Sequence, residues 1–265
     1  MDVKLLLSTP EEKPLDRLVT DGGFCGIFRT IGCIGDSLSS GEFEAVDETG
    51  QTGYYDYYDY SWGQYLARMA GCRVYNFSRG GMTAETYCKS FAEENGFWNP
   101  DKPCQAYIIA LGVNDVVNRR GEIGSVKDIC SDDYRENRPT FAGYYGQIVQ
   151  RMKAIQPKAR FFFMTIPRGS KDPEVNRIGD EHAALLYTLA EFFPYSYVLD
   201  FRKYAPEYDE DFHKKFFLRG HMNPCGYILT AQMVASYMDY IIRHNMEEFQ
   251  QVGLIGTPHY MENLF

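Results

Sequence analysis

The chain has 265 residues, of which 45% are hydrophobic and 24% charged, a balance typical of globular proteins and unlike that of disordered or fibrous ones. Its formal net charge of -9 argues against a nucleic-acid partner, because binding to a phosphate backbone requires clustered Lys and Arg side chains. The apolar run near the N-terminus, Leu5 to Leu7, is too short for a signal sequence or a membrane span, so we expect a cytoplasmic protein with no membrane partner.

The cysteines predict no disulfide framework and no zinc site. There are seven, an odd number, and they are scattered without a C-x-x-C pair or a histidine at zinc spacing. Reduced thiols are the simplest interpretation. Cys33 and Cys72 fall inside apolar runs, where a free cysteine usually acts as a small core residue.

Short apolar runs alternate with longer stretches that carry apolar residues at three- and four-residue spacing. This alternation is typical of βαβ units around a parallel sheet, and it predicts one α/β domain over residues 1–265 with a core at about 29–246. The predicted strands are Arg29 to Ile34, Arg73 to Phe77, Tyr107 to Leu111, Arg160 to Thr165 and Tyr197 to Asp200. The predicted helices are Trp62 to Met69, Thr83 to Phe91, Phe141 to Ile155, Val175 to Phe192 and Gly226 to Met246.

Three long connections separate these elements. The first, Glu42 to Tyr60, is rich in tyrosine and is predicted to be a loop, either packed on the surface or lining a substrate site. The others, Asn118 to Pro139 and Lys203 to Lys215, are polar and resemble the long functional loops of compact α/β domains. Asn223 followed by Pro224 predicts the cap and first residue of the last helix.

Polar and glycine residues follow three of the predicted strands and precede the last helix. Ser37 stands in G-D-S-L-S directly after the first strand, and the pair Gly80 and Gly81 follows the second. Asn114 comes directly after the third strand, and His221 lies on the connection that feeds the last helix. Because ligands of an open α/β sheet bind beyond the carboxyl ends of the strands, we expect these residues to share one rim.

Such residues are the parts of an acyl-transfer site. A serine oxygen attacks a carbonyl, a histidine takes its proton and returns it to the leaving group, and amide donors stabilise the oxyanion. Each residue also has a simpler interpretation, since Ser37 could cap a helix and Asn114 could satisfy loop backbone groups. Their order and their placement at strand ends favour the catalytic interpretation.

The four blocks resemble those of the SGNH hydrolases, also called GDSL esterases or lipases, which contribute Ser, Gly, Asn and His in this order. The resemblance covers Ile31 to Tyr227. It implies that Ser37 is the nucleophile and that its own N–H, the Gly81 amide and the Asn114 side chain are the oxyanion donors. It also implies that His221 is the general base. The fold implied is a flavodoxin-like three-layer αβα sandwich, in agreement with the five-stranded parallel sheet predicted above.

One departure from the family concerns the group that orients the histidine. The family usually has an aspartate three residues before the histidine, and Leu218 stands at that position here. Two alternatives remain. A backbone carbonyl of Leu218 or Arg219 orients His221 in a Ser-His dyad, which we favour, or a carboxylate of the preceding loop does so, Asp209 and Asp211 being nearest.

No metal or other cofactor is predicted. Asp36 and Asp115 flank the predicted site, but no Asp, Glu or His cluster with ligand spacing accompanies them. Arg168, after the fourth strand, is interpreted as a solvated loop residue rather than a substrate contact. The other histidines have no predicted role, His182 and His244 lying on helix patterns and His213 and His259 in polar segments.

We therefore predict a serine esterase acting on small or medium acyl esters, with a carbohydrate O-acetyl group as one candidate. Lysophospholipase or thioesterase activity is the alternative within the same chemistry. A catalytically silent glycan-binding module is a rival of another class, which the missing aspartate supports. A flavodoxin-like nucleotide or flavin binder is disfavoured, because no Gly-rich phosphate loop follows the first strand. The oligomeric state is not predicted.

Overall fold

The computed structural model describes residues 3–261, and its centre is a five-stranded parallel sheet with the strand order β4-β1-β5-β6-β7. Counted along the sheet this is the 2-1-3-4-5 order of flavodoxin-like folds, as expected. The strands are Thr30–Gly35 (β1), Arg73–Asn76 (β4), Ala106–Ala110 (β5), Arg160–Met164 (β6) and Ser196–Leu199 (β7). Strand β1 lies between β4 and β5, with Cys33 opposite Asn76, the last residue of β4, and Gly35 opposite Ala110, the last residue of β5.

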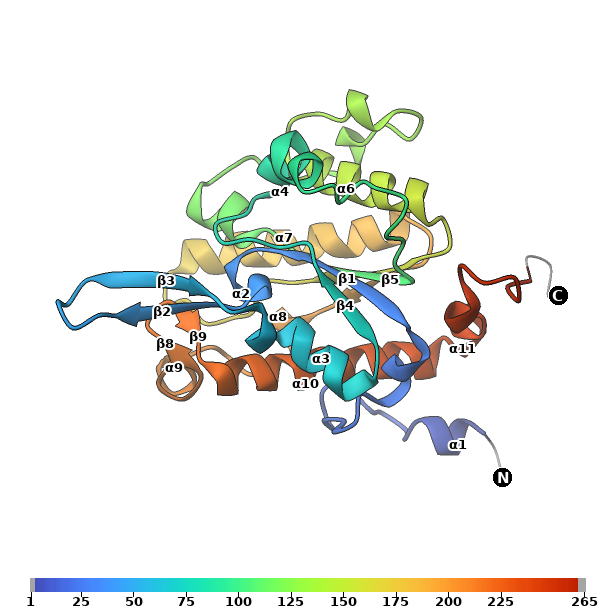
Figure 1. Ribbon diagram of the computed structural model, residues 1–265, viewed down its shortest axis with the longest axis horizontal. Helices are drawn as coiled ribbons and strands as arrows, with labels where there is room; N and C mark the ends of the chain where they lie inside the picture. Colours follow the sequence, from blue (N-terminus) through green and yellow to red (C-terminus); the bar gives the residue numbers. More distant parts are fainter. Residues whose placement is uncertain (1–2, 262–265) are drawn as a thin grey trace.

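Helices cover both faces of the sheet and complete three layers (Figure 1). One face carries α6 (Phe141–Ile155), α7 (Pro173–Phe192) and the helix formed by α4 (Ala84–Thr86), a π-helical turn (Tyr87–Phe91) and α5 (Ala92–Glu94). The other face carries α3 (Trp62–Ala70) and α10 (Pro224–His244), which contact each other. The shorter helices are α1 (Lys4–Leu7), α2 (Ser37–Ser40), α8 (Phe201–Tyr204), α9 (Glu210–Phe216) and α11 (Met246–Phe249).

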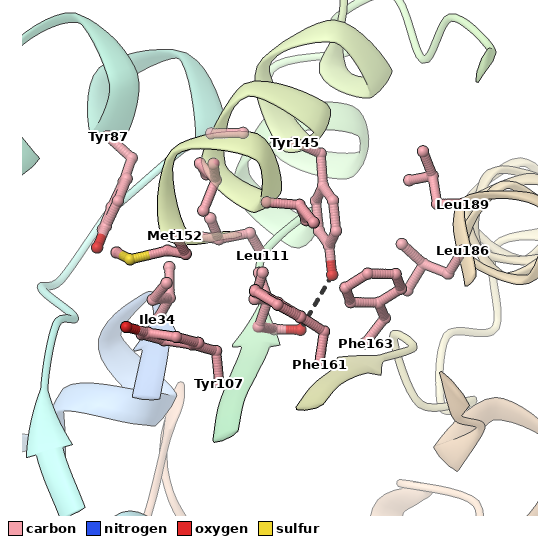
Figure 2. Packing of buried hydrophobic residues seen from close by; sticks show 14 of the residues in the cluster. Ile34, Tyr87, Tyr107, Leu111, Tyr145, Met152, Phe161, Phe163, Leu186 and Leu189 are labelled. Carbon is pink, nitrogen blue, oxygen red and sulfur yellow. Dashed lines mark hydrogen bonds between the residues drawn. The ribbon is translucent and has the colours of Figure 1, made fainter. Parts of the chain in front are cut away.

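The sheet is buried on both faces because its strands alternate apolar side chains between two hydrophobic clusters. In β6, Phe161 and Phe163 belong to the cluster under α6 and α7, whereas Phe162 belongs to the cluster under α10. All three are fully buried. Figure 2 shows the first cluster, in which the buried Tyr145 hydroxyl of α6 donates a hydrogen bond to the Ile109 carbonyl at 3.3 Å. This packing makes the strand ends a rigid platform for the loops that follow them.

The helix ends follow the predicted capping chemistry. The Asn223 side chain accepts a hydrogen bond from the Gly226 N–H at 2.9 Å, and Pro224 is the first residue of α10, as expected. Asp172 and Pro173 begin α7 in the same way. The cap at Asn223 fixes the point at which the connection carrying His221 enters α10.

Two predicted loops contain regular structure. Residues 42–60 include the antiparallel hairpin β2 (Glu42–Val46) and β3 (Thr52–Asp56), with Glu44 opposite Tyr54. Figure 1 shows this hairpin projecting beyond the end of the main sheet. Residues 203–215 include most of α9, where a loop was expected. A second, very short hairpin joins β8 (Phe217–Leu218) to β9 (His221–Met222), and both of its strands contact β2.

All seven cysteines are free. Cys33 is fully buried, as predicted, and Cys72 is only partly buried but packs against the same cluster. No helix within residues 3–261 is both long and apolar enough to cross a membrane.

Candidate active site

Ser37 is the first residue of α2, directly beyond the carboxyl end of β1. The helix cap is its neighbour Asp36, whose side chain accepts from the Leu38 N–H at 3.1 Å, so Ser37 does not act as a cap. Ser37 is partly exposed, and its N–H donates no hydrogen bond to the described residues. The serine hydroxyl and its own amide are therefore both available at the strand end.

Two further amide donors flank Ser37, one from each neighbouring strand end. Gly81 follows β4, is exposed, and has a φ of 68°, a left-handed backbone conformation that favours glycine. Its N–H donates no hydrogen bond within residues 3–261. Asn114 follows β5 in a π-helical turn, and its Nδ2 donates to the Met82 carbonyl at 3.2 Å. That contact ties Asn114 to the Gly81 loop and leaves its second amide hydrogen without a partner among the described residues.

His221 begins β9, which contacts both α2 and β2. Its side chain is only 15% exposed. Within the described residues no hydrogen bond joins His221 to Ser37, although β9 and α2, the elements that carry them, contact each other. The four predicted residues therefore lie on elements at one edge of the sheet, and the histidine contacts side chains other than Ser37.

That engagement is with two carboxylates of the β2 strand. Glu42 Oε1 lies 3.1 Å from His221 Nε2, and Glu44 Oε2 lies 3.6 Å from His221 Nδ1. The two glutamates are 18% and 12% exposed. Burial raises the pKa of Glu42, and attraction to the imidazole of His221 partly opposes this. The edge of the Tyr54 ring packs against the imidazole, with centroids 5.7 Å apart.

Neither expected orienting group contacts the imidazole. His221 Nδ1 is buried without a hydrogen-bond partner among the described residues, so no backbone carbonyl accepts from it. Asp209 instead caps α9 by accepting from the Phe212 N–H, and Asp211 pairs with Lys215. The carboxylates that face the ring come from the β2–β3 hairpin. The sequence predicted a loop there and no orienting group for His221.

Comparison with known proteins identifies the family of the chain. The model of the GDSL-like lipase/acylhydrolase family matches residues 33–229, which is most of the chain and includes all four predicted catalytic residues. The chain belongs to this family. No curated protein matches the chain.

Solved structures agree with the assignment at the level of the fold. A Lactobacillus plantarum protein of 17% identity has a TM-score of 0.57, with 80% of this chain and 97% of that chain covered. Two carbohydrate esterases of family 2, both 15% identical, are also similar. The enzyme from Corynascus thermopiles (Myceliophthora fergusii), with its carbohydrate binding domain, has a TM-score of 0.55 over 80% of this chain and 66% of that one. The Clostridium thermocellum enzyme in complex with cellohexaose has a TM-score of 0.54, over 83% and 65%.

The two aspartates of the GDSL-family motifs are structural hydrogen-bond acceptors. Asp115 Oδ1 accepts from the Ala84 N–H at 2.8 Å, just as Asp36 accepts from Leu38. Burial raises the pKa of Asp36 to about 7 and that of Asp115 to about 6. Within residues 3–261 no group of three His, Cys, Asp or Glu side chains could hold a metal ion.

A mainly apolar cavity of about 370 Å³ lies beside this site, beyond the ends of β5 and β6. None of the four predicted catalytic residues lines it, but the neighbours of three of them do. These are Asp36 and Leu38 around Ser37, Val113 before Asn114, and Met222 after His221. Apolar side chains from other elements complete the wall, among them Leu111, Met164, Ile166, Val175 and Phe201. The cavity therefore lies next to the residues on either side of Ser37.

Two residues without a predicted role line this cavity. Arg168 is half exposed and forms an ion pair with Asp180 at 3.0 Å. This ion pair lies at the surface, beside the cavity wall. His213, expected to lack a partner, stacks on Phe217 with ring centroids 4.1 Å apart.

The remaining histidines lie outside the cavity wall. His182 is fully buried, with Nε2 3.1 Å from the Leu111 carbonyl, and burial lowers its pKa to about 4. His244 and His259 are exposed.

Proposed function

We propose that the chain is a serine esterase that cleaves small or medium acyl esters through an acyl-enzyme on Ser37. The observation that carries the proposal is the meeting of a partly exposed serine hydroxyl with two unengaged backbone amides and an asparagine at adjacent strand ends. Those groups match what a tetrahedral oxyanion requires. Membership of an acylhydrolase family supports the same chemistry.

The chemical steps assign one task to each residue. Ser37 Oγ attacks the ester carbonyl carbon while its proton passes to His221 Nε2. The amides of Ser37 and Gly81 and the Asn114 Nδ2 donate to the oxygen that becomes negatively charged. His221 then gives the proton to the departing alcohol, and a water repeats the sequence to release the acid. Because Glu42 contacts Nε2 in the substrate-free site, its carboxylate must move aside before this transfer.

The surroundings support a two-part substrate. The apolar cavity beside Ser37 is several times larger than an acetyl group, which favours medium acyl chains. The exposed ring of Tyr54, which touches His221 and is 61% exposed, offers a stacking surface for a sugar. Two carbohydrate esterases with the same fold keep an O-acyl carbohydrate among the candidates. Lysophospholipid and thioester substrates place their acyl groups in the same cavity and are the alternative.

A fluorophosphonate probe tests the nucleophile, because it reacts only with an activated serine. We expect wild type to label and Ser37→Ala to lose labelling, whereas Ser125→Ala, at an exposed serine that caps a turn, labels as wild type does. Labelling that persists in Ser37→Ala refutes the assignment. A wild-type chain that never labels indicates the silent glycan-binding module instead.

A series of p-nitrophenyl esters from acetate to decanoate then reports the acyl preference. We expect kcat/KM to rise from acetate to medium chains. A maximum at acetate would exclude the cavity as the acyl site.

A further inference from the structure

We propose that Glu44 is the positioning residue that orients His221 through Nδ1, in place of the aspartate that the family carries at the position of Leu218. The inference rests on the proposed esterase function. It concerns a residue of the β2–β3 hairpin that contacts the imidazole but not the reacting atoms. The groups that face the two nitrogens of the imidazole ring support it.

The imidazole has one nitrogen on the buried side and one on the reaction side. Nδ1 is buried and has no hydrogen-bond partner within the described residues, and the acceptor that faces it is Glu44 Oε2 at 3.6 Å. That distance exceeds a hydrogen bond, and catalytic contacts in substrate-free sites often shorten when substrate binds. A buried N–H without an acceptor costs about 1–3 kcal/mol, so closing this gap is favourable.

The carboxylate of Glu44 is itself held in place by the turn that precedes His221. Gly220 N–H donates to Glu44 Oε2 at 2.8 Å, and Arg219 Nε lies 3.3 Å from Glu44 Oε1. Arg219 has a φ of 58°, a left-handed conformation that is costly for a residue with a side chain. The strained turn therefore presents both an N–H and a guanidinium to one carboxylate, and that carboxylate faces the imidazole.

Glu42 cannot orient His221 through Nδ1, because Glu42 faces the other nitrogen of the ring. Its Oε1 lies at Nε2, the nitrogen that must accept the proton of Ser37. Its Oε2 lies against Gly80, since a methyl group on that glycine would collide with it, and Gly80 adjoins the donor Gly81. Glu42 thus occupies the reaction side. Were Nε2–H to donate to Glu42 permanently, the basic lone pair would sit on buried Nδ1 and face the carboxylate of Glu44.

The proton balance follows from this arrangement. Once substrate is bound, Nδ1–H donates to Glu44 and its proton stays on nitrogen, so the lone pair is on Nε2. When the Ser37 oxygen bonds to the carbonyl carbon, its proton moves to Nε2, and the imidazolium is stabilised by the negative charge of Glu44. The same proton leaves Nε2 for the alcohol as the ester bond breaks. Other groups that face the ring are Glu42 on β2 and Tyr54 on β3, and neither contacts Nδ1.

The experiment compares the full-length variants Glu44→Gln and Glu48→Gln on the best p-nitrophenyl ester. Gln retains an oxygen for the Gly220 N–H but removes the charge. Glu48, an exposed residue in the turn of the same hairpin, is the matched control. We expect Glu44→Gln to lower kcat by about a hundredfold or more with KM within about threefold, and Glu48→Gln to match wild type. A purely structural role for Glu44 would lower thermal stability and leave kcat per labelled site unchanged.

The tautomer of His221 provides a second measurement that needs no change at Glu44. Long-range ¹H–¹⁵N NMR spectra of Glu42→Gln at about pH 9, with the signal assigned by its loss when His221 is also changed to Asn, should show the Nδ1–H form, because no charged carboxylate then faces Nε2. The Nε2–H form, or a kcat for Glu44→Gln within about threefold of the Glu48→Gln value, overturns the proposal. A wild-type chain that neither labels nor hydrolyses esters refutes the proposed function instead, so the two failures are distinguishable.

Discussion

Replacing Asp36 with asparagine should stabilise the protein much more at alkaline pH than at acidic pH. Asp36 is 5% exposed and precedes the proposed nucleophile. Its side chain accepts from the Leu38 N–H at the start of α2. Asparagine is also a good helix cap and keeps the accepting oxygen, so the substitution removes the ionisable proton and little else.

The magnitude follows from the pKa of this carboxyl group. Burial raises the pKa of Asp36 from its ordinary 3.8 to about 7. Between these values the folded chain binds a proton that the unfolded chain has lost, so this group makes stability fall as pH rises through that window. Each tenfold change in proton binding corresponds to about 1.4 kcal/mol, so the cost above pH 7 is about 4 kcal/mol. Asp36→Asn avoids that cost.

Urea unfolding at pH 5 and pH 8.5 gives the free energy of unfolding of wild type and of the variant. The effect is the change with pH in the difference between the two proteins. Titrating groups that do not interact with Asp36, such as His182, are common to both proteins and cancel in it. We expect Asp36→Asn to gain about 2.5–3 kcal/mol relative to wild type between the two pH values, because part of the cost is already present at pH 5. Asp172→Asn, at the exposed cap of α7, should show no such dependence. An equal stability change at both pH values would show that Asp36 ionises freely in the folded chain.

Two further predictions concern the same rim. Glu42→Gln should raise kcat/KM about fivefold, because the charged carboxylate 3.1 Å from His221 Nε2, a contact of about 1 kcal/mol, no longer competes with the Ser37 hydroxyl for that nitrogen. A kcat/KM equal to that of wild type would contradict this contact. Gly112→Ala should lower the free energy of unfolding by about 3 kcal/mol, since Gly112 has a φ of 136° and a methyl group there collides with His182 Nε2. Gly26→Ala, where the added methyl group meets only the Ala70 carbonyl at 3.6 Å, is the control for urea unfolding, and equal midpoints would refute the clash.

The sequence predicted the sheet well because buried parallel strands are short apolar runs that stand out between amphipathic helices. The helix Phe141–Ile155 has the predicted bounds, and the five strands agree to within one or two residues. Ser37, Gly81 and Asn114 were located because strand ends in such sheets meet at one edge. Their common placement therefore follows from topology, which the periodicity of the chain already determines.

The carboxylates at His221 escaped prediction for a physical reason. In β2 the sequence Glu42-Phe43-Glu44 alternates acidic and aromatic residues, which is the period of a strand with one polar face, but the tyrosines that follow obscured the pairing. The alternation was the available signal. The alternation predicts which side chains share a face of the strand. The turn that this face contacts, Leu218 to His221, follows much later in the chain, Gly220 lying 176 residues after Glu44, and the contact is fixed only by tertiary packing.

The position of the acid also determines how strongly it can act. Leu218, at the usual place of the aspartate, is 43% exposed, so a carboxylate there would be largely solvated. Glu44 is 12% exposed and accepts a hydrogen bond from the turn that it faces. At this partly buried position water screens its charge less. Supplying the carboxylate from the hairpin therefore couples the activation of His221 to the pairing of β2 with β3. Substitutions that loosen this hairpin should lower kcat without unfolding the sheet, because Phe43 is its one residue that packs against either core cluster and the buried members of both clusters lie in other elements.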